Sequence, residues 1–193
     1  MIRTKDDLKY YLEQDRIANH KEPITTFRRR IVNWIFPDNN YEYLRCLRKL
    51  EYCINSNCWG GLLKFYYYKK LSRIRRKTGI ELPPNVAGPG LHIPHGKIVV
   101  NSVAKIGREC KILSDVTIGW QGRYDLKGAP QIGNRVFIGS GAKIIGNISI
   151  ADDVVIGANS VLIKSVTEAG ITVAGIPAVK VSDKGSYHYL NKN

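Results

Sequence analysis

The stretch Ile138–Leu162 reads IGSGAKIIGNISIADDVVIGANSVL, and a branched aliphatic residue stands at every sixth position of it. A period of six fits neither a helix, which repeats every 3.6 residues, nor a long strand, which repeats every two. It is typical of short parallel strands joined by tight turns, and it predicts a parallel β-helix with these side chains inside. The full series is Val100, Ile106, Ile112, Ile118, Ile132, Ile138, Ile144, Ile150, Ile156 and Leu162.

Two further positions of the repeat are also patterned. Glycine often follows the aliphatic residue, and we expect it to allow turn conformations that a side chain would strain; these glycines are Gly107, Gly119, Gly133, Gly139 and Gly157. A small or branched residue comes four positions after the aliphatic one and is expected to fill a corner: Ala104, Cys110, Val116, Gly122, Val136, Ala142, Ile148, Val154 and Ser160. Ile118 and Ile132 are 14 positions apart, one period plus eight, which predicts an inserted loop at Tyr124–Gln131.

The first 79 residues lack this period. Thr4 and Asp7 form a capping-box pattern that opens a helix over TKDDLKYYLEQDRIAN, and further helices are expected near 41–54 and 61–77. We therefore expect an α-helical N-terminal domain at 1–79, a β-helix domain at 80–181 and a tail at 182–193. The stretch LLKFYYYKKLSRIRRK reads as an amphipathic helix with its aromatic residues turned inward, and nucleic-acid binding is the alternative.

Composition limits the classes of protein. The chain of 193 residues has a net charge of +14, which suits an anionic partner such as a phosphorylated cofactor, although a merely solvated basic surface is the alternative. Its four cysteines show no metal-ligand spacing and are expected to be reduced and mostly buried. No apolar run is long enough for a membrane span, and the N-terminus lacks the pattern of a secretory signal. We expect a cytoplasmic protein.

The hexapeptides, together with the phrase VAGIPAVKV, resemble the hexapeptide-repeat acyltransferases. IGSGAKIIGNISI and IGANSVLIKSV are most similar to serine acetyltransferases and to related O-acetyltransferases of surface-polysaccharide loci. The resemblance covers roughly residues 80–181. It implies a left-handed parallel β-helix with an α-helical N-terminal domain, acetyl-CoA as co-substrate and no metal. It also implies a homotrimer or a dimer of trimers, with active sites between protomers and no nucleic-acid partner.

Two histidines lie in GPGLHIPHGKIVV, residues 88–100. As metal ligands, His92 and His95 lack a third partner in the neighbouring coils. Imidazole suits a general base that takes a proton from a hydroxyl group, because its pKa lies near working pH. In the family resembled, the base follows a GxGLxIxH-like phrase, which places it at His95 and leaves His92 to support the turn. By position, Glu81 is the candidate that orients His95, and a surface glutamate is the alternative.

The resemblance also implies a binding site for acetyl-CoA and for its acceptor. Motif matches place the coenzyme against Ser140, Gly141, Ala158, Lys164 and Lys180. Trp120 and Arg123, beside and within the inserted loop, are the candidates that contact the acceptor.

Two departures from serine acetyltransferases bear on the acceptor. Those enzymes carry an Asp just before the base and an Arg-His pair in the loop, which hold the charges of serine. Here Pro94 and Gly128–Ala129 stand in those places. A carboxylate would lose a bidentate guanidinium partner, whereas a sugar hydroxyl needs none. We therefore expect O-acetylation of a sugar in surface-polysaccharide biosynthesis. The alternatives are a serine O-acetyltransferase of cysteine biosynthesis, with Arg123 holding the carboxylate, and a non-catalytic basic β-helix module.

Overall fold

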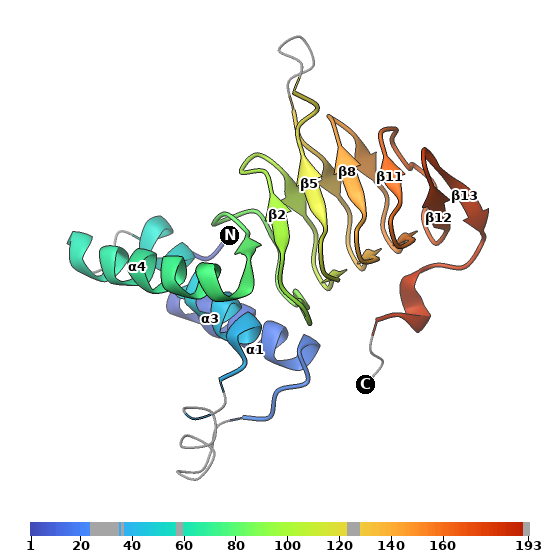
Figure 1. Cartoon of the computed structure of the whole chain (residues 1–193). Helices are drawn as coiled ribbons and strands as arrows, with labels where there is room; N and C mark the ends of the chain where they lie inside the picture. The colour runs from blue at the N-terminus through green and yellow to red at the C-terminus, as the bar shows by residue number, and fades with distance from the viewer. Residues whose placement is uncertain (24–34, 36, 57–59, 123–127, 191–193) are drawn as a thin grey trace.

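The computed structural model describes residues 1–23, 35, 37–56, 60–122 and 128–190. The described residues of the N-terminal part include the helices α1 (Lys5–Ala18), α3 (Asn39–Asn55) and α4 (Gly60–Thr78), which lie at one end of a β-helix formed by the later residues (Figure 1). α4 ends at Thr78 and the first strand begins at Ile80. The sequence predicts the change from helices to β-helix at the same place. The division into separate domains stays a prediction.

The helices begin where the sequence predicts. Thr4 accepts a hydrogen bond from the Asp7 N–H and donates its own N–H to the Asp7 carboxylate, so the capping box at the start of α1 is confirmed. Asp38 caps α3 by accepting from the N–H groups of Asn40 and Tyr41. None of the described helices has the length and apolar character to cross a membrane.

The orientation of the α4 aromatic residues differs from the expected one. Tyr67 packs against the core, but Phe65, Tyr66 and Tyr68 are exposed. The inward packing that we expected for these rings is therefore wrong for three of the four. The reason is that Leu63, Tyr67, Leu71 and Ile74 already form the inward stripe of the helix, and the other rings fall outside it.

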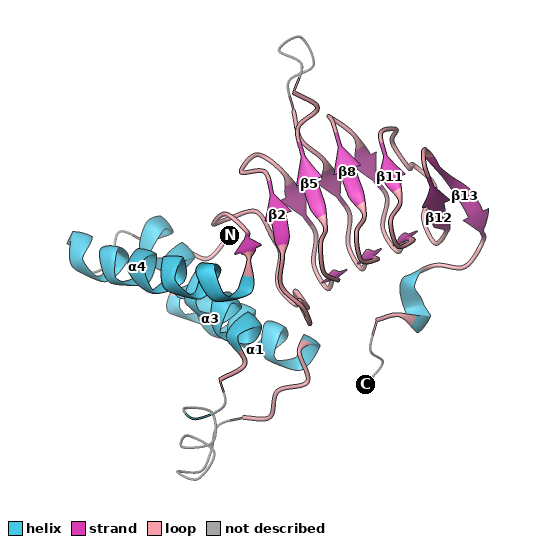
Figure 2. Ribbon diagram, viewed as in Figure 1, coloured by secondary structure: helices cyan, strands magenta, loops and turns pink. Residues whose placement is uncertain are grey.

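The strands form three sheets that run the length of the β-helix (Figure 2). Sheet A contains β1 (Ile80–Glu81), β2 (Ile98–Val100), β5 (Thr117–Gly119), β8 (Lys143–Ile145) and β11 (Val161–Leu162). Sheet B contains β3 (Lys105–Ile106), β6 (Gln131–Ile132) and β9 (Ser149–Ile150). Sheet C contains β4 (Lys111–Ile112), β7 (Phe137–Ile138), β10 (Val155–Ile156), β12 (Thr172–Gly175) and β13 (Ala178–Ser182). Neighbours pair in parallel, except for the closing β12–β13 hairpin.

The six-residue period fixes the interior. None of the ten aliphatic positions is more than 5% exposed, which confirms the prediction that they point inside. The expected corner residues are buried too, except Gly122, which is exposed. Pro130 takes that place, because a corner residue precedes the next aliphatic by two positions, and Pro130 stands two before Ile132.

The inserted loop is visible in the strand register. Val100 pairs with Ile118, and Ile144 with Leu162, each 18 positions on, but Ile118 pairs with Ile144, 26 positions on. The excess of eight confirms an insertion between β5 and β6. Residues 123–127 lie outside the described ones, and Gln131 is the first residue of β6 rather than part of the loop.

Four of the five repeat glycines, all but Gly119, are required for a different reason from the one expected. Their φ angles are not positive, whereas turn residues such as Asp115 (φ 61°), Asp153 (φ 60°) and Asn159 (φ 55°) take the left-handed conformation. What excludes a side chain is the next coil. A Cβ on Gly107 would stand 2.4 Å from the Gly133 carbonyl oxygen, and one on Gly139 would stand 2.6 Å from the Ala158 nitrogen.

This close approach predicts different effects for two alanine substitutions. Gly107→Ala is expected to lower the free energy of unfolding by about 1–3 kcal/mol, since main chain must shift to admit the methyl group. Gly119→Ala is the matched control, because its Cβ would meet nothing nearer than 3.6 Å. Urea unfolding of both variants measures the difference. Equal stability losses would contradict the steric explanation.

Candidate functional site

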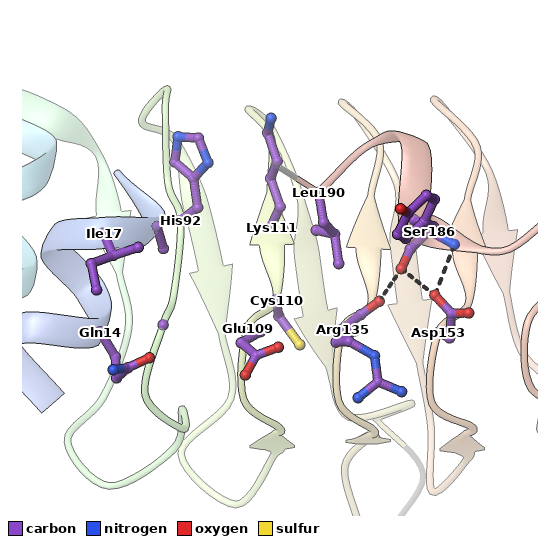
Figure 3. Close-up of a pocket in the computed structure, with 13 residues that line it drawn as sticks. Gln14, Ile17, His92, Glu109, Cys110, Lys111, Arg135, Asp153, Ser186 and Leu190 are labelled. Atoms are coloured by element: carbon purple, nitrogen blue, oxygen red, sulfur yellow. Dashed lines mark hydrogen bonds between the residues drawn. The ribbon is translucent and has the colours of Figure 1, made fainter. Parts of the chain in front are cut away.

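His92 and His95 lie in different hollows of the surface. His95 is exposed, stands just before β2, and lines a hollow of about 560 Å³. The other residues of that hollow come from the start of α3, the end of α4, the two positions after His95 and the next coil: Pro37, Asp38, Asn39, Asn40, Lys77, Thr78, Gly96, Lys97, Ser114 and Asp115. His92 lines a second hollow of about 500 Å³ on the outer face of sheet C (Figure 3).

The hollow at His95 contains charges of both signs. Asp38 and Asp115 supply carboxylates, and Lys77 and Lys97 supply ammonium groups. Burial by itself raises the pKa of Asp38, but the ion pair with Lys21 (2.6 Å) and the N–H bonds at the α3 cap outweigh it and leave that pKa below its usual value. Asp38 is therefore a carboxylate at neutral pH, and the hollow can bind a ligand that carries both charges.

Sequence reasoning missed these four charged residues. They come from four separate parts of the chain, so no spacing within one motif connects them. The one available signal was Asp38, which stands at the start of an expected helix, where an acid reads as a cap. Only the fold brings that cap to His95.

His92 has the surroundings of a structural residue. Its N–H donates to the Cys110 carbonyl (2.9 Å), and its own carbonyl accepts from the Ile112 N–H (3.0 Å). Burial, with a smaller contribution from the nearby Lys111, lowers the pKa of its imidazole to about 4, so the ring is neutral near pH 7. Figure 3 shows its ring on the same side of the sheet as Lys111, and Ser186 bonded to Arg135 and Asp153 at the other end of the hollow.

A buried ion cluster lies beneath the histidine stretch. Arg48 of α3 contacts Asp15 of α1 (2.8 Å) and Glu51 of α3 (3.0 Å), and each of the three side chains is at most 2% exposed. Burial alone lowers the pKa of Arg48, but the two carboxylates outweigh it and hold that pKa above its usual value. The guanidinium of Arg48 is thus charged and paired with both acids inside the protein.

The same cluster binds the main chain of the first coil. Asp15 Oδ1 accepts hydrogen bonds from the N–H groups of Gly90 and Leu91, both 2.9 Å. Arg48 donates to the carbonyl oxygens of Ala87 (2.8 Å) and Gly88 (2.6 Å). The residues immediately before His92 are therefore fixed by charged side chains from two helices.

The side chains of Glu51, Asn19 and Asn40 extend this contact in both directions. Glu51 accepts from the Asn85 N–H (2.7 Å), and Asn19 donates to the Leu91 carbonyl (2.8 Å). Asn40 of α3 donates to the carbonyl of Pro94 (2.9 Å), the residue directly before His95. The helices thus hold the main chain from residue 85 to the neighbour of the candidate base.

Three of the predicted coenzyme residues share a corner with His95. Ser140, Gly141 and Ala158 precede strands of sheet A, as His95 does. The Gly141 N–H donates to Ser114 O in the His95 hollow, and the Asn159 N–H donates to Ser140 O. Main-chain hydrogen bonds therefore connect the successive coils at this corner. The Ala158 N–H makes no hydrogen bond within the part of the chain that the structure describes, and so can pair with an amide of a bound pantetheine.

Two other candidates lie on the opposite edge of sheet A. Trp120 and Lys164 follow β5 and β11, whereas His95 precedes β2. Because the strands are parallel, the sheet separates these residues from His95 within one chain. Lys164 is exposed and forms no ion pair with any described residue. Lys180, on β13 at the far end, contacts Glu168 and Asp183, both at 2.6 Å.

The remaining site predictions stay untested. Glu81 lies on β1 and forms an ion pair with Arg75, and it is not among the residues that line the His95 hollow. Its role in orienting His95 stays a prediction. Arg123 lies outside the described residues. Within the described ranges, no three His, Cys, Asp or Glu side chains gather as a metal site would require.

The buried cluster predicts a large stability difference between two arginines of α3. Arg48→Met leaves Asp15 and Glu51 buried without their cation, and is expected to reduce the free energy of unfolding by about 3–5 kcal/mol. Arg45→Met, which removes the more exposed pair with Glu42, is the control and should change it by less than about 1 kcal/mol. Chemical unfolding checks both values. An Arg48 variant as stable as the Arg45 variant would show that the cluster contributes little.

The sequence of this chain is similar to those of known proteins. Residues 129–164 match the family model described as bacterial transferase hexapeptide (six repeats). The serine acetyltransferase of Staphylococcus epidermidis is 34% identical over 186 residues, which cover 95% of this chain and 79% of that protein. The serine acetyltransferase of Helicobacter pylori is 39% identical over 123 residues, which cover 62% of this chain and 71% of that protein.

A solved structure extends the agreement to the fold. The crystal structure of serine acetyltransferase in complex with coenzyme A from Brucella abortus has a TM-score of 0.73 and 26% identity, over 94% of this chain and 70% of that one. The predicted fold class, a left-handed β-helix with a helical N-terminal domain, is thereby confirmed, as is acetyl-CoA as the donor. The protein is an acyltransferase. By its repeats, its fold and its relatives along nearly its whole length, this chain belongs to the serine acetyltransferase family of hexapeptide-repeat acyltransferases.

Proposed function

We propose that this acyltransferase transfers the acetyl group of acetyl-CoA to the hydroxyl oxygen of L-serine, with His95 as the general base. The observation that carries the proposal is the mixed-charge hollow at His95, which suits the zwitterion of an amino acid. The relatives from S. epidermidis and H. pylori, both named serine acetyltransferase, support the same acceptor. The sequence departures at Pro94 and Gly128–Ala129 favour a sugar acceptor over serine. The relatives support serine better.

The charges of serine have partners in this hollow. Lys77 and Lys97 are placed to hold a carboxylate, and Asp38 and Asp115 to hold an ammonium group. They would replace, from other elements, the acidic and basic residues that the sequence lacks at Pro94 and Gly128–Ala129. Lys77 comes from the end of α4 and Asp38 from the start of α3, so the helical part of the chain would supply half of the binding site.

The proposed chemistry is a direct transfer. A ring nitrogen of His95 takes the proton of the hydroxyl group as its oxygen bonds to the carbonyl carbon of the thioester. The carbon–sulfur bond then breaks, and the proton passes from His95 to the departing sulfur, which leaves as the thiol of CoA. No covalent acyl-enzyme is formed. Ser140, Gly141 and Ala158 would hold the pantetheine along the corner that leads to His95.

A sugar hydroxyl is the second candidate acceptor. Pro94 and Gly128–Ala129 favour it, because they remove the side chains that the resembled enzymes use for serine. The half-buried Trp120 beside the inserted loop is a suitable face for a sugar ring. In that case the enzyme would act in surface-polysaccharide biosynthesis. A non-catalytic module is not supported, since the family assignment makes the chain an acyltransferase.

The acceptor is decided by initial rates at saturating acetyl-CoA. L-serine at millimolar concentration is expected to give saturable formation of O-acetylserine, while nucleotide sugars and glycans give little CoA release. D-serine and L-alanine serve as controls, the second because it has the charges of serine without a hydroxyl group. Saturable transfer to a sugar, with serine no better than other small alcohols, would replace the serine proposal by the second candidate.

The assignment of the base predicts unequal effects of two histidine substitutions. His95→Ala should lower kcat by about 100- to 10,000-fold, the usual contribution of a positioned general base. Acetyl-CoA affinity should change little. His92→Ala is the control and should lower kcat far less, because its neutral ring lies in the other hollow. If His92→Ala had the larger effect, His95 would not be the base.

We propose further that the enzyme is a trimer, or a dimer of trimers, that acts in the cytoplasm. Sheet A separates His95 from Trp120 and Lys164 within one chain, so a site containing all three needs a second copy. Val99 and Ile163 are exposed apolar residues of that sheet region and fit such a contact. The buried thiols of Cys46 and Cys110, which form no disulfide with any described residue, support a reducing compartment.

The trimer predicts a definite mass in solution. Light scattering should give three or six times the subunit mass of 21.7 kDa. Val99→Asp with Ile163→Asp should lower both the mass and kcat, because the shared site would be broken. A fully active enzyme with the mass of one subunit would contradict the shared site.

A further inference from the structure

The outward face of α4 begins with an exposed apolar group. Leu62 is 86% exposed, Phe65 60% and Tyr66 54%. Tyr67, Leu71 and Ile74 point the other way, toward the core, and Leu63 is half-buried. A surface that places three large apolar side chains together in water is unusual unless it has a binding partner.

The same face continues as a row of cations. Lys69, Arg73 and Arg76 follow the apolar group at spacings of three and four residues, which keeps them on one side of the helix. α4 contains seven Lys or Arg and no Asp or Glu. None of the three forms an ion pair with a described residue, although Lys69 lies over the Phe65 ring at 5.4 Å. The positive charges of these three side chains are therefore available to an anionic partner.

The shape of this face favours a lipid surface over a nucleic acid. Single-stranded nucleic acids are bound in grooves where cations follow the backbone and flat rings stack on bases. The α4 face is the outer side of one helix, its most exposed apolar residue is the aliphatic Leu62, and its cations follow the apolar group rather than alternating with it. Helices that lie in a membrane interface typically combine Leu, Phe and Tyr with Lys and Arg, as this face does.

The position of α4 gives such binding a consequence for the site. Its last turn supplies Lys77 and Thr78 to the hollow that contains His95. Figure 1 shows α4 running from the outer end of the helical part to the first strand of the β-helix. A helix that lies on a membrane along this face would bring the His95 hollow close to the same surface.

We propose that the outward face of α4, formed by Leu62, Phe65, Tyr66, Lys69, Arg73 and Arg76, binds the surface of a membrane that contains anionic lipids. The apolar side chains enter the interface, and the cations pair with lipid phosphates. The binding is peripheral and reversible. It does not depend on which acceptor the enzyme uses.

Co-sedimentation of the full chain with vesicles tests the proposal. One set of vesicles is phosphatidylcholine alone, and the other contains about 30% phosphatidylglycerol. The protein should bind the anionic vesicles and be released by high salt. A variant with Lys69, Arg73 and Arg76 changed to Gln should bind at least about tenfold more weakly, and Leu62→Ser with Phe65→Ser should have a similar effect.

A matched variant controls for net charge. Lys5, Arg108 and Lys184 are also exposed, and changing all three to Gln removes the same charge away from α4. This variant should bind vesicles nearly as well as the unchanged protein. All variants should keep their acetyl-CoA turnover in solution, since none of these residues lines the His95 hollow.

Three results would overturn the proposal. One is no binding to anionic vesicles, and another is an equal loss of binding in the matched variant. The third is a lower oligomer mass in the α4 variants, which would make this face a contact between copies of the chain. Binding of single-stranded nucleic acid that the α4 variants abolish, with no vesicle binding, would replace the lipid by a nucleic acid.

Discussion

The contact between Arg48, Asp15 and Glu51 supports both the fold and the candidate site. A β-helix satisfies its main-chain groups by pairing each coil with the next, so the first coil has unpaired groups on its outer side. Here helical side chains bond those groups one after another: Tyr43 at Leu82, Glu51 at Asn85, Arg48 at Ala87 and Gly88, and Asp15 at Gly90 and Leu91. The helices therefore cover the end of the β-helix and also supply hydrogen-bond partners for its main-chain groups.

This contact also explains the position of His95. The stretch from Gly88 to Pro94 contains no helix and no strand longer than a single bridge, so the next coil holds it at only a few main-chain groups. Asp15, Asn19 and Asn40 fix it from outside, up to the residue before His95. A general base must stay within hydrogen-bond reach of its substrate, and a main chain held on both sides of a turn meets that requirement.

The sequence predicted the repeating parts of the structure well, because each coil repeats the same packing problem. The interior aliphatics, the length of the insertion and the capping box of α1 were all predicted correctly. Gly122 was assigned to a corner that Pro130 fills, since counting forward from Ile118 crosses the insertion. The repeat glycines were identified correctly but for the wrong reason, because the close approach of the next coil cannot be seen in one repeat.

The candidate site was less predictable because its parts come from distant elements. In the sequence, Asp15, Arg48 and Glu51 look like ordinary charges on amphipathic helices, and only the fold shows them buried together. Asp38 and Lys77 likewise line the hollow of His95 from the ends of two helices. The exposed aromatics of α4 were misread because a basic, aromatic helix has two apolar sides and the sequence does not show which one is covered.

Hydrogen exchange at the amides of Gly90 and Leu91 tests most directly whether the helices hold the histidine stretch. Both should exchange about as slowly as the Gly139 amide, which is bonded within the β-helix. Asp15→Asn should accelerate exchange at Gly90 and Leu91 by at least about tenfold more than at Gly139. Rapid exchange at Gly90 and Leu91 in the unaltered protein, or no change on substitution, would contradict the claim that this contact fixes the stretch before His95.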